Sequence, residues 1–279
     1  MTVLGLLLIG MFVEDQLPGM ALVPAGTFWM GRTHMFQFDE LDWTARPRLD
    51  DQPARPVDID TFYIDKYEVT TTEFAKFAQA TGRAKPWNWK DGKVNPGQEQ
   101  WPVYNVTWDD ASAYCAWAGK RLPAEAEWEK AARGGSDKKL FPWGDILEPE
   151  APPADAPAAS APDNKPLVKT VKMARYGFPN GPVSVGSFPP NGYGLHDVIG
   201  NVWEWTSDWY TQYYYSIAPS KNPRGPETGK YRVLRGGGWA TEAGGGGAGL
   251  TLLGSHYRNY GTGDQASNVV GFRCAKDAR

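Results

Sequence analysis

A short segment in the last third of the chain carries the side chains best suited to hold a metal ion. Asp197 and Glu204 offer hard carboxylate oxygens, and Gly200 and Val202 between them can offer backbone carbonyl oxygens. A curled loop with only oxygen ligands suits Ca²⁺, which takes roughly six to eight of them. The segment therefore predicts a calcium site. The alternative is that both carboxylates only accept hydrogen bonds from backbone N–H groups of the turn.

Histidine-based and nucleophilic chemistry have little support in this sequence. Its three histidines, His34, His196 and His256, show none of the H-x-x-H or H-x-x-x-H spacings of a histidine metal site. We therefore expect each of them to be an ordinary packed or surface residue. The phosphate-binding-loop, G-x-S-x-G and H-E-x-x-H motifs are also missing. The sequence thus gives no reason to expect a hydrolase that works through an activated nucleophile.

The chain has two cysteines, Cys115 and Cys274, which is neither a disulfide scaffold nor a zinc-ribbon pattern. One interpretation is a pair of buried free thiols. The other is a single long-range disulfide, which would indicate an oxidising compartment. By the chain-entropy model, closing so long a loop adds about 4–5 kcal/mol to stability.

Composition limits the class of protein. The 279 residues are 41% hydrophobic and 22% charged, which excludes a disordered chain. The net charge of −3 argues against a general nucleic-acid binder, which needs a basic surface. The 32 glycines and 23 prolines break regular elements, and the 13 tryptophans need deep packing. We expect a compact fold rich in ordered loops and not a helical bundle.

The apolar and polar pattern predicts short strands followed by three short helices. A strand with an internal turn is expected over 20–31, and the alternating segment 57–65 predicts a half-buried strand. Thr70 and Thr107 are each followed three residues later by an acidic residue, which is the pattern of a helix-initiating capping box. Pro123 suits the first position of a third helix. The last third of the chain is strand-like and rich in aromatic residues.

Two segments stand apart in composition. Residues 1–19 contain an apolar run at 3–13 that is too short for a bilayer span of about 20 residues. It is interpreted as the remnant of a signal or anchor, as an element packed on the domain, or as a tail that docks on a partner. The Ala/Pro-rich stretch 146–163 is expected to be an extended surface insertion within a single domain, 20–279.

A set of segments with specific spacing covers nearly the whole chain. They are ALVPAGTFWMG (21–31), FYIDKYEVTTTEFAKF (62–77), PVYNVTWDDASAYCAWAGKRLPAEAEWEKAARGG (102–135), GSFPPNGYGLHDVIGNVWEWTSDWY (186–210), YRVLRGGGWA (231–240) and GFRCA (271–275). Together they resemble the formylglycine-generating enzyme family, also called the sulfatase-modifying-factor domain. The resemblance implies an α+β fold related to C-type lectins, with one domain, little regular secondary structure, three short helices and short antiparallel strands.

The resemblance does not establish that this chain has the family's activity, because a fold does not by itself imply a function. The founding activity of the family oxidises a substrate cysteine to formylglycine with two closely spaced cysteines that bind copper. Thiolates are needed there because soft sulfur ligands hold Cu(I). The corresponding segment here, 235–254, has no cysteine, and Gly238 stands where the family has a serine. The resemblance therefore implies no copper and no formylglycine-generating activity.

Further expectations come from the resemblance. In some exported relatives the positions of Cys115 and Cys274 are joined, which implies that disulfide here. The family's structural calcium site corresponds to four positions of this sequence, Asp197, Gly200, Val202 and Glu204. The family's ligand cleft is formed by a segment whose candidates here are Trp239, Glu242, His256, Tyr257 and Arg258.

These expectations lead to one main functional hypothesis and two rivals. The main one is a calcium-stabilised, non-catalytic binding or accessory subunit, exported or periplasmic, with a protein partner and possible membrane association through its apolar N-terminus. The first rival is a cysteine-independent oxidoreductase that resembles the pyoverdine-maturation oxidases and acts on a ligand in the same cleft. The second is a sequence-variable display protein with this lectin-like fold.

Overall fold

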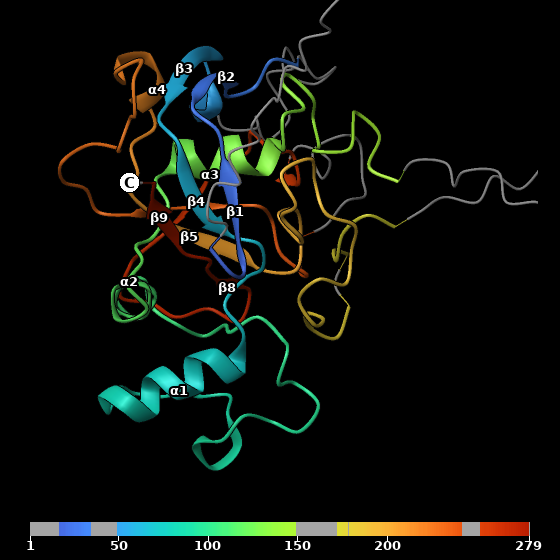
Figure 1. The fold of residues 1–279 in the computed structure, drawn as a ribbon, viewed down its shortest axis with the longest axis vertical. Coiled ribbons are helices and arrows are strands. Elements are labelled where there is room, and N and C mark those ends of the chain that lie inside the picture. Colours follow the sequence, from blue (N-terminus) through green and yellow to red (C-terminus); the bar gives the residue numbers. More distant parts are fainter. Residues whose placement is uncertain (1–16, 35–48, 149–171, 178, 242–251, 279) are drawn as a thin grey trace, which may run out of the picture.

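The computed structural model of the chain describes residues 17–34, 49–148, 172–177, 179–241 and 252–278. These residues form one mixed α+β domain with few helices and short strands (Figure 1). The strands of the described part are β1 (Met20–Val23), β2 (Gly26–Met30), β3 (Arg55–Ile59), β4 (Phe62–Asp65), β5 (Trp203–Trp209), β6 (Arg232–Arg235), β7 (Asn259–Gly261), β8 (Val270–Gly271) and β9 (Ala275–Asp277).

The strands make three small sheets that bring distant parts of the sequence together. β4 lies between β1 and β9, so the beginning and the end of the domain pair with one another. β2 pairs with β3, and the largest sheet has the order β7-β6-β5-β8. The expectation of antiparallel strands holds for most pairs, but β8 runs parallel to β5. The strand predicted over 57–65 is two strands, because β3 pairs with β2 whereas β4 pairs with β1.

The three predicted helices are present, and a short fourth helix was not predicted. They are α1 (Thr71–Thr81), α2 (Trp108–Trp117), α3 (Glu125–Arg133) and α4 (Tyr214–Ile217), with 3-10 turns at Leu49–Asp51 and Lys90–Gly92. The predicted capping boxes at Thr70 and Thr107 both form. Pro123 is not the first residue of α3, since Ala124 is the N-cap and α3 begins one residue later. Glu127 instead sets this start, because its carboxylate accepts the Ala124 N–H at 2.8 Å.

The hydrophobic core has two parts. One lies among β1 to β4 and α3 and contains Trp128, and the other lies among α1, α2 and β5 and contains Trp205. Both indoles are 1% exposed. Figure 1 shows α1 at the bottom of the molecule with α2 above it, and the paired strands β2 and β3 near the top. α3 packs against β2, β3, β5 and β6, so it is central to the domain.

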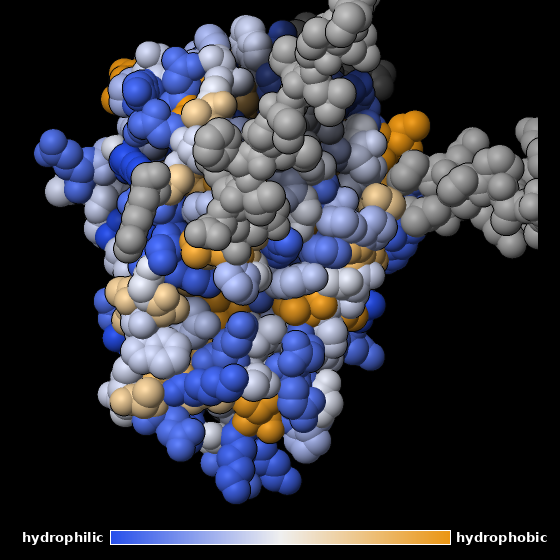
Figure 2. Space-filling model, in the orientation of Figure 1, coloured by the Kyte–Doolittle hydropathy of each residue, from blue (hydrophilic) through white to orange (hydrophobic). Residues whose placement is uncertain are grey.

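The visible surface is mostly hydrophilic, with scattered hydrophobic residues (Figure 2). Within the described ranges, every helix is too short or too polar to cross a bilayer. Residues 1–16 of the predicted apolar segment, and 149–163 of the predicted insertion, lie outside the described residues.

Candidate metal centre and ligand cleft

The loop before β5, residues 197–202, is tightly curled. Asp197, Gly200 and Asn201 all have positive φ, at 56°, 81° and 56°. A Cβ at Gly200 would lie 2.4 Å from the Arg175 carbonyl oxygen, so only glycine fits there. The Asn201 N–H donates to that same carbonyl at 2.9 Å. The loop is thus held in one conformation by the chain beside it.

Glu204 is fully occupied by protein partners. Its Oε2 accepts hydrogen bonds from Trp128 Nε1 and Arg273 Nε, both at 2.8 Å. Its Oε1 pairs with Arg273 NH2 at 2.8 Å, and the side chain is 0% exposed. A bidentate arginine pair of this kind is strong and directional. Glu204 thus connects β5 to α3 and to Arg273, and its role as a metal ligand stays a prediction.

Glu68, which the sequence did not single out, lies beside Asp197 instead. Its Oε1 accepts from Asn201 Nδ2 at 3.1 Å, and the neighbouring ring of Tyr67 stacks on His196 at 4.8 Å. Glu68 is 1% exposed and Asp197 4%. Asp197 Oδ2 accepts the Gly186 N–H, but Asp197 Oδ1 and Glu68 Oε2 are buried without a hydrogen-bond partner. Such atoms are rare in native proteins and need an explanation.

Burial and like charge disfavour the ionised forms of this pair of carboxyls. Burial, and then the charge of Asp197, raise the pKa of Glu68 well above its usual range. Burial also raises the pKa of Asp197. Besides Asp197, the charged groups that act most strongly on Glu68 are Arg273 and Glu204. The excess negative charge can be neutralised by protonation of a carboxyl or by a bound divalent cation.

The donor set fits calcium better than a transition metal. Carboxylate and carbonyl oxygens are hard ligands of the kind that Ca²⁺ prefers. Throughout the described ranges, no three or more His, Cys, Asp or Glu side chains gather in a metal-binding arrangement. A cation here would therefore depend on Glu68, Asp197 and backbone oxygens, for which Gly200 and Val202 remain the candidates.

Three of the predicted cleft residues lie in the core. His256, Tyr257 and Arg258 are 1%, 8% and 0% exposed. Arg258 makes a bidentate ion pair with Glu125 of α3, with Nε–Oε1 at 2.7 Å and NH2–Oε2 at 3.0 Å. His256 Nδ1 lies 2.8 Å from Asp51 Oδ2, and burial lowers the pKa of this imidazole. These side chains hold α3 and Leu49–Asp51 to the domain, and they do not form a cleft wall.

The remaining two cleft candidates are Trp239 and Glu242, of which the structure describes only Trp239. Trp239 is half-buried, and its indole Nε1–H donates to the Asn268 carbonyl at 3.1 Å. It is therefore available at the surface, tied to the segment before β8. Glu242 lies outside the described residues.

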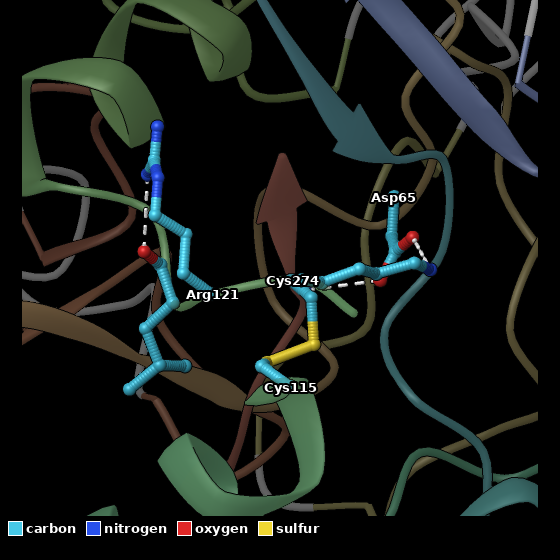
Figure 3. The surroundings of a disulfide bond; sticks show 6 residues. Asp65, Cys115, Arg121 and Cys274 are labelled. Atoms are coloured by element: carbon cyan, nitrogen blue, oxygen red, sulfur yellow. Dashed lines mark hydrogen bonds and ion pairs between the residues drawn. A yellow bond between two sulfur atoms is a disulfide. The ribbon is translucent and has the colours of Figure 1, made fainter. Parts of the chain in front are cut away.

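The two cysteines of the chain are bonded to one another. Cys115 of α2 and Cys274, the residue before β9, form a disulfide with Cα atoms 5.6 Å apart, and both are 0% exposed (Figure 3). The Asp65 carboxylate lies beside the disulfide. It accepts hydrogen bonds from the Cys274 backbone N–H at 3.0 Å and from Lys120 Nζ at 2.5 Å. Since the sequence has no other cysteine, the chain holds no free thiol.

Comparisons with known proteins agree with this architecture. A family profile described as "Sulfatase-modifying factor enzyme 1-like domain" matches residues 9–278. The mouse protein named "Formylglycine-generating enzyme" is 36% identical over 303 residues, covering 92% of this chain and 75% of that protein. A second mouse protein, "Inactive C-alpha-formylglycine-generating enzyme 2", is 33% identical over 306 residues, covering 94% and 87%. Among solved structures, PvdO from Pseudomonas aeruginosa matches with a TM-score of 0.66 and 26% identity, covering 93% of this chain and 94% of that one.

Proposed function

We propose a function on the premise that this chain belongs to the family of sulfatase-modifying factor enzyme 1-like domains. The proposal is a calcium-stabilised domain without formylglycine-generating activity that serves as a binding or accessory subunit. Family membership supplies the scaffold, and the chemistry must be argued from the residues present.

The state of the two cysteines supports the loss of the founding activity. Copper-dependent oxidation of a substrate cysteine needs a pair of thiolates close in space and accessible to substrate. Cys115 and Cys274 are buried, bonded to each other and 159 positions apart. Neither sulfur can ligate copper while the bond is intact. One relative, 33% identical to this chain over 306 residues, carries the word "Inactive" in its name.

A direct assay tests this. The purified chain is incubated with a cysteine-containing sulfatase peptide and copper, and mass spectrometry follows the conversion of thiol to aldehyde. We expect no conversion, while an active formylglycine-generating enzyme, run in parallel, converts the peptide. Conversion by this chain that is absent in a Cys115→Ser/Cys274→Ser double variant would overturn the proposal.

Calcium would have a structural role in this proposal. Glu68 and Asp197 would hold the ion with backbone oxygens of the loop that leads into β5. Two buried oxygens without hydrogen-bond partners support this assignment. When bound, the cation supplies charge neutralisation only, and it would fix the 197–202 loop against the segment that carries Glu68.

The accessory role and the compartment are argued from the disulfide and from the apolar N-terminal segment. A buried disulfide is typical of exported or periplasmic proteins. The apolar segment 1–19 would then contact a membrane or a partner subunit. Native mass spectrometry on the protein from its own source tests both points. A stoichiometric partner would support an accessory subunit, whereas a lone monomer would count against it.

The alternative is a cysteine-independent oxidoreductase. The likeness to PvdO, at 26% identity over nearly the whole of both chains, keeps this alternative open. In that case carboxylates and aromatic residues of the cleft would carry the chemistry, with Glu242 as a candidate. Oxygen uptake with candidate phenols, lost in a Glu242→Ala variant, would favour this alternative over a binding role.

A further inference from the structure

A pocket of about 300 Å³ opens between α2 and the edge of β5 and β6; neither Glu68 nor Asp197 lines it, although Lys120 also lines the pocket that contains Glu68. Its lining includes the cationic side chains Lys120, Arg121, Arg224 and Arg232, and no acidic residue. Apolar walls come from α2 and from Leu122, and two serine hydroxyls, Ser112 and Ser207, complete it. A concave site with one sign of charge concentrates ligands of the opposite sign.

Most of these cations have carboxylate partners behind the pocket. Lys120 pairs with Asp65 at 2.5 Å, and Arg121 pairs with Glu127 at 2.6 Å. Arg224 also reaches Glu127, at 3.2 Å. Their charges are therefore partly neutralised. They add to the positive electrostatic potential of the pocket but do not contact the ligand directly.

Arg232 differs from them. Within the described ranges it makes no ion pair with a carboxylate. Its guanidinium lies between two indoles, with its central carbon 3.6 Å from the ring centroid of Trp108 and 3.3 Å from that of Trp209. NH1 donates to the Ser207 carbonyl at 2.7 Å. Burial lowers the pKa of this arginine, so its charge is incompletely solvated.

The stacking of Arg232 between Trp108 and Trp209 restricts the directions in which its guanidinium can donate hydrogen bonds to a ligand. Both faces of the guanidinium are covered, so further hydrogen bonds must leave in its plane. A planar fork held in one orientation suits the two oxygens of an oxyanion. A second pocket, of about 460 Å³, shares Trp108 and Arg232 and is lined also by Lys230, Asp109 and Asp264, so its charges balance and only the first pocket is cationic. The two pockets meet at the guanidinium.

We propose that Arg232 is the anchor of a binding site for an organic oxyanion: a carboxylate, sulfonate or phosphate group attached to an apolar body. The oxyanion lies in the plane of the guanidinium beside Ser112, and the apolar part packs on Leu122 and the edge of Trp108. This site is separate from both the metal centre and the cleft around Trp239. It does not depend on calcium or on the absence of formylglycine-generating activity.

The test uses benzoate, benzenesulfonate and phenyl phosphate as probes on the intact chain. Benzamidine and benzyl alcohol have similar bodies with positive or no charge. We expect weak binding of the anions, with dissociation constants in about the millimolar range. The indole N–H signals of Trp108 and Trp209 should shift in NMR spectra, and the cationic and neutral probes should not produce these shifts. The ranking of the three anions identifies the oxyanion class.

A matched pair of variants separates binding from folding. Ser112→Asp places a negative charge in the pocket and leaves the Trp–Arg–Trp sandwich in place, whereas Ser112→Asn has nearly the same shape without the charge. We expect Ser112→Asp to weaken anion binding about tenfold or more, with little change for Ser112→Asn. Arg232→Lys keeps the charge but loses the planar fork, and should also weaken binding. Lys93→Gln, at an exposed position elsewhere, should have no effect.

Several outcomes would overturn the proposal. They are no anion binding at tens-of-millimolar concentration, equal binding of benzoate and benzamidine, or equal affinities of the two Ser112 variants. Unchanged binding in a folded Arg232→Lys variant would reassign the anion to the other cations of the pocket and would contradict Arg232 as its anchor.

Discussion

Two groups of buried charges in this domain are built on opposite principles. Around α3, Glu125 and Glu129 are 1% and 0% exposed, and each is matched by arginine. Glu125 pairs with Arg258, and Glu129 accepts from both Arg133 and Arg235, at 2.7 and 2.5 Å. Beside β5, Glu68 and Asp197 are buried almost as deeply, yet each retains an oxygen without a partner.

The pKa values show the consequence of this difference. Burial would raise the pKa of Glu129, but the charges of Arg133 and Arg235 outweigh it and the pKa is lowered. For Glu68 the like charge of Asp197 adds to burial, and the pKa is raised. A buried carboxylate is therefore tolerable where the fold itself supplies the cation. Where the fold does not, the carboxyl either takes up a proton or needs an external cation, such as the calcium proposed above.

The strongest test of the balanced group is removal of one arginine. Arg258→Ala removes the bidentate partner of the buried Glu125 and leaves it only the longer contact with Arg235 NH1 at 3.5 Å, so we expect a loss of about 3 kcal/mol in the free energy of unfolding. Urea unfolding followed by tryptophan fluorescence measures it. An Arg258→Met/Glu125→Gln double variant should recover much of the loss, because no charge is then left without a partner. A loss below about 1 kcal/mol for Arg258→Ala would mean that the ion pair is not isolated from solvent.

The unbalanced group is tested by calcium. At a calcium concentration about one hundred times its dissociation constant, binding would add about 2.7 kcal/mol, which raises Tm by about 5–10 °C. EGTA should reverse this rise in the native chain. Glu68→Gln should lose most of the calcium response, yet in EGTA it should be at least as stable as the native chain, because one unpaired charge is gone. Calorimetry with Glu99→Gln as an exposed control measures both effects.

An intermediate case lies between the two groups. Burial, and then the charge of Glu125, raise the pKa of Asp208 to about 7. The folded state thus holds a proton that the unfolded chain releases near pH 4, so stability should fall as the pH rises from about 4 to about 7. Asp208→Asn removes this dependence and should be more stable than the native chain at pH 8, by a few kcal/mol at most. Urea unfolding at pH 5 and pH 8, with Asp264→Asn as control, measures it. Equal pH dependence of both variants would contradict the assignment.

The smallest effect is expected at the surface. Arg83 contacts Asp109 and Asp110 at the start of α2, with Nε–Oδ1 of Asp110 at 2.6 Å. The Asp109 side chain is 76% exposed, so water screens the interaction. Arg83→Gln should change the free energy of unfolding by less than about 1 kcal/mol, and salt should remove the difference. A larger effect that persists at high salt would show that exposure does not separate the two kinds of charge pair.

Local features of the fold could be predicted well from the sequence. The boxes at Thr70 and Thr107 join residues three positions apart, so one short segment contains all the information that starts α1 and α2. The split of 57–65 between two sheets could not be predicted, because it depends on which distant strands pair with each half. For the same reason, the sequence could not show that His256 and Arg258 lie in the core instead of lining a cleft. Their partners, Asp51 and Glu125, lie far away in sequence.

By itself, the sequence determined the family and the starts of α1 and α2, and it predicted a calcium-suited loop at 197–202. Only the tertiary structure decided which carboxylate faces that loop. Glu204 is close to the loop in sequence but is paired with Arg273. Glu68 lies 133 positions before Asn201 in the sequence, yet it accepts a hydrogen bond from the Asn201 side chain. A pattern of residue types can show that an oxygen atom exists. Whether that oxygen is free depends on every donor that folding brings within hydrogen-bond distance, and a linear sequence does not contain those distances.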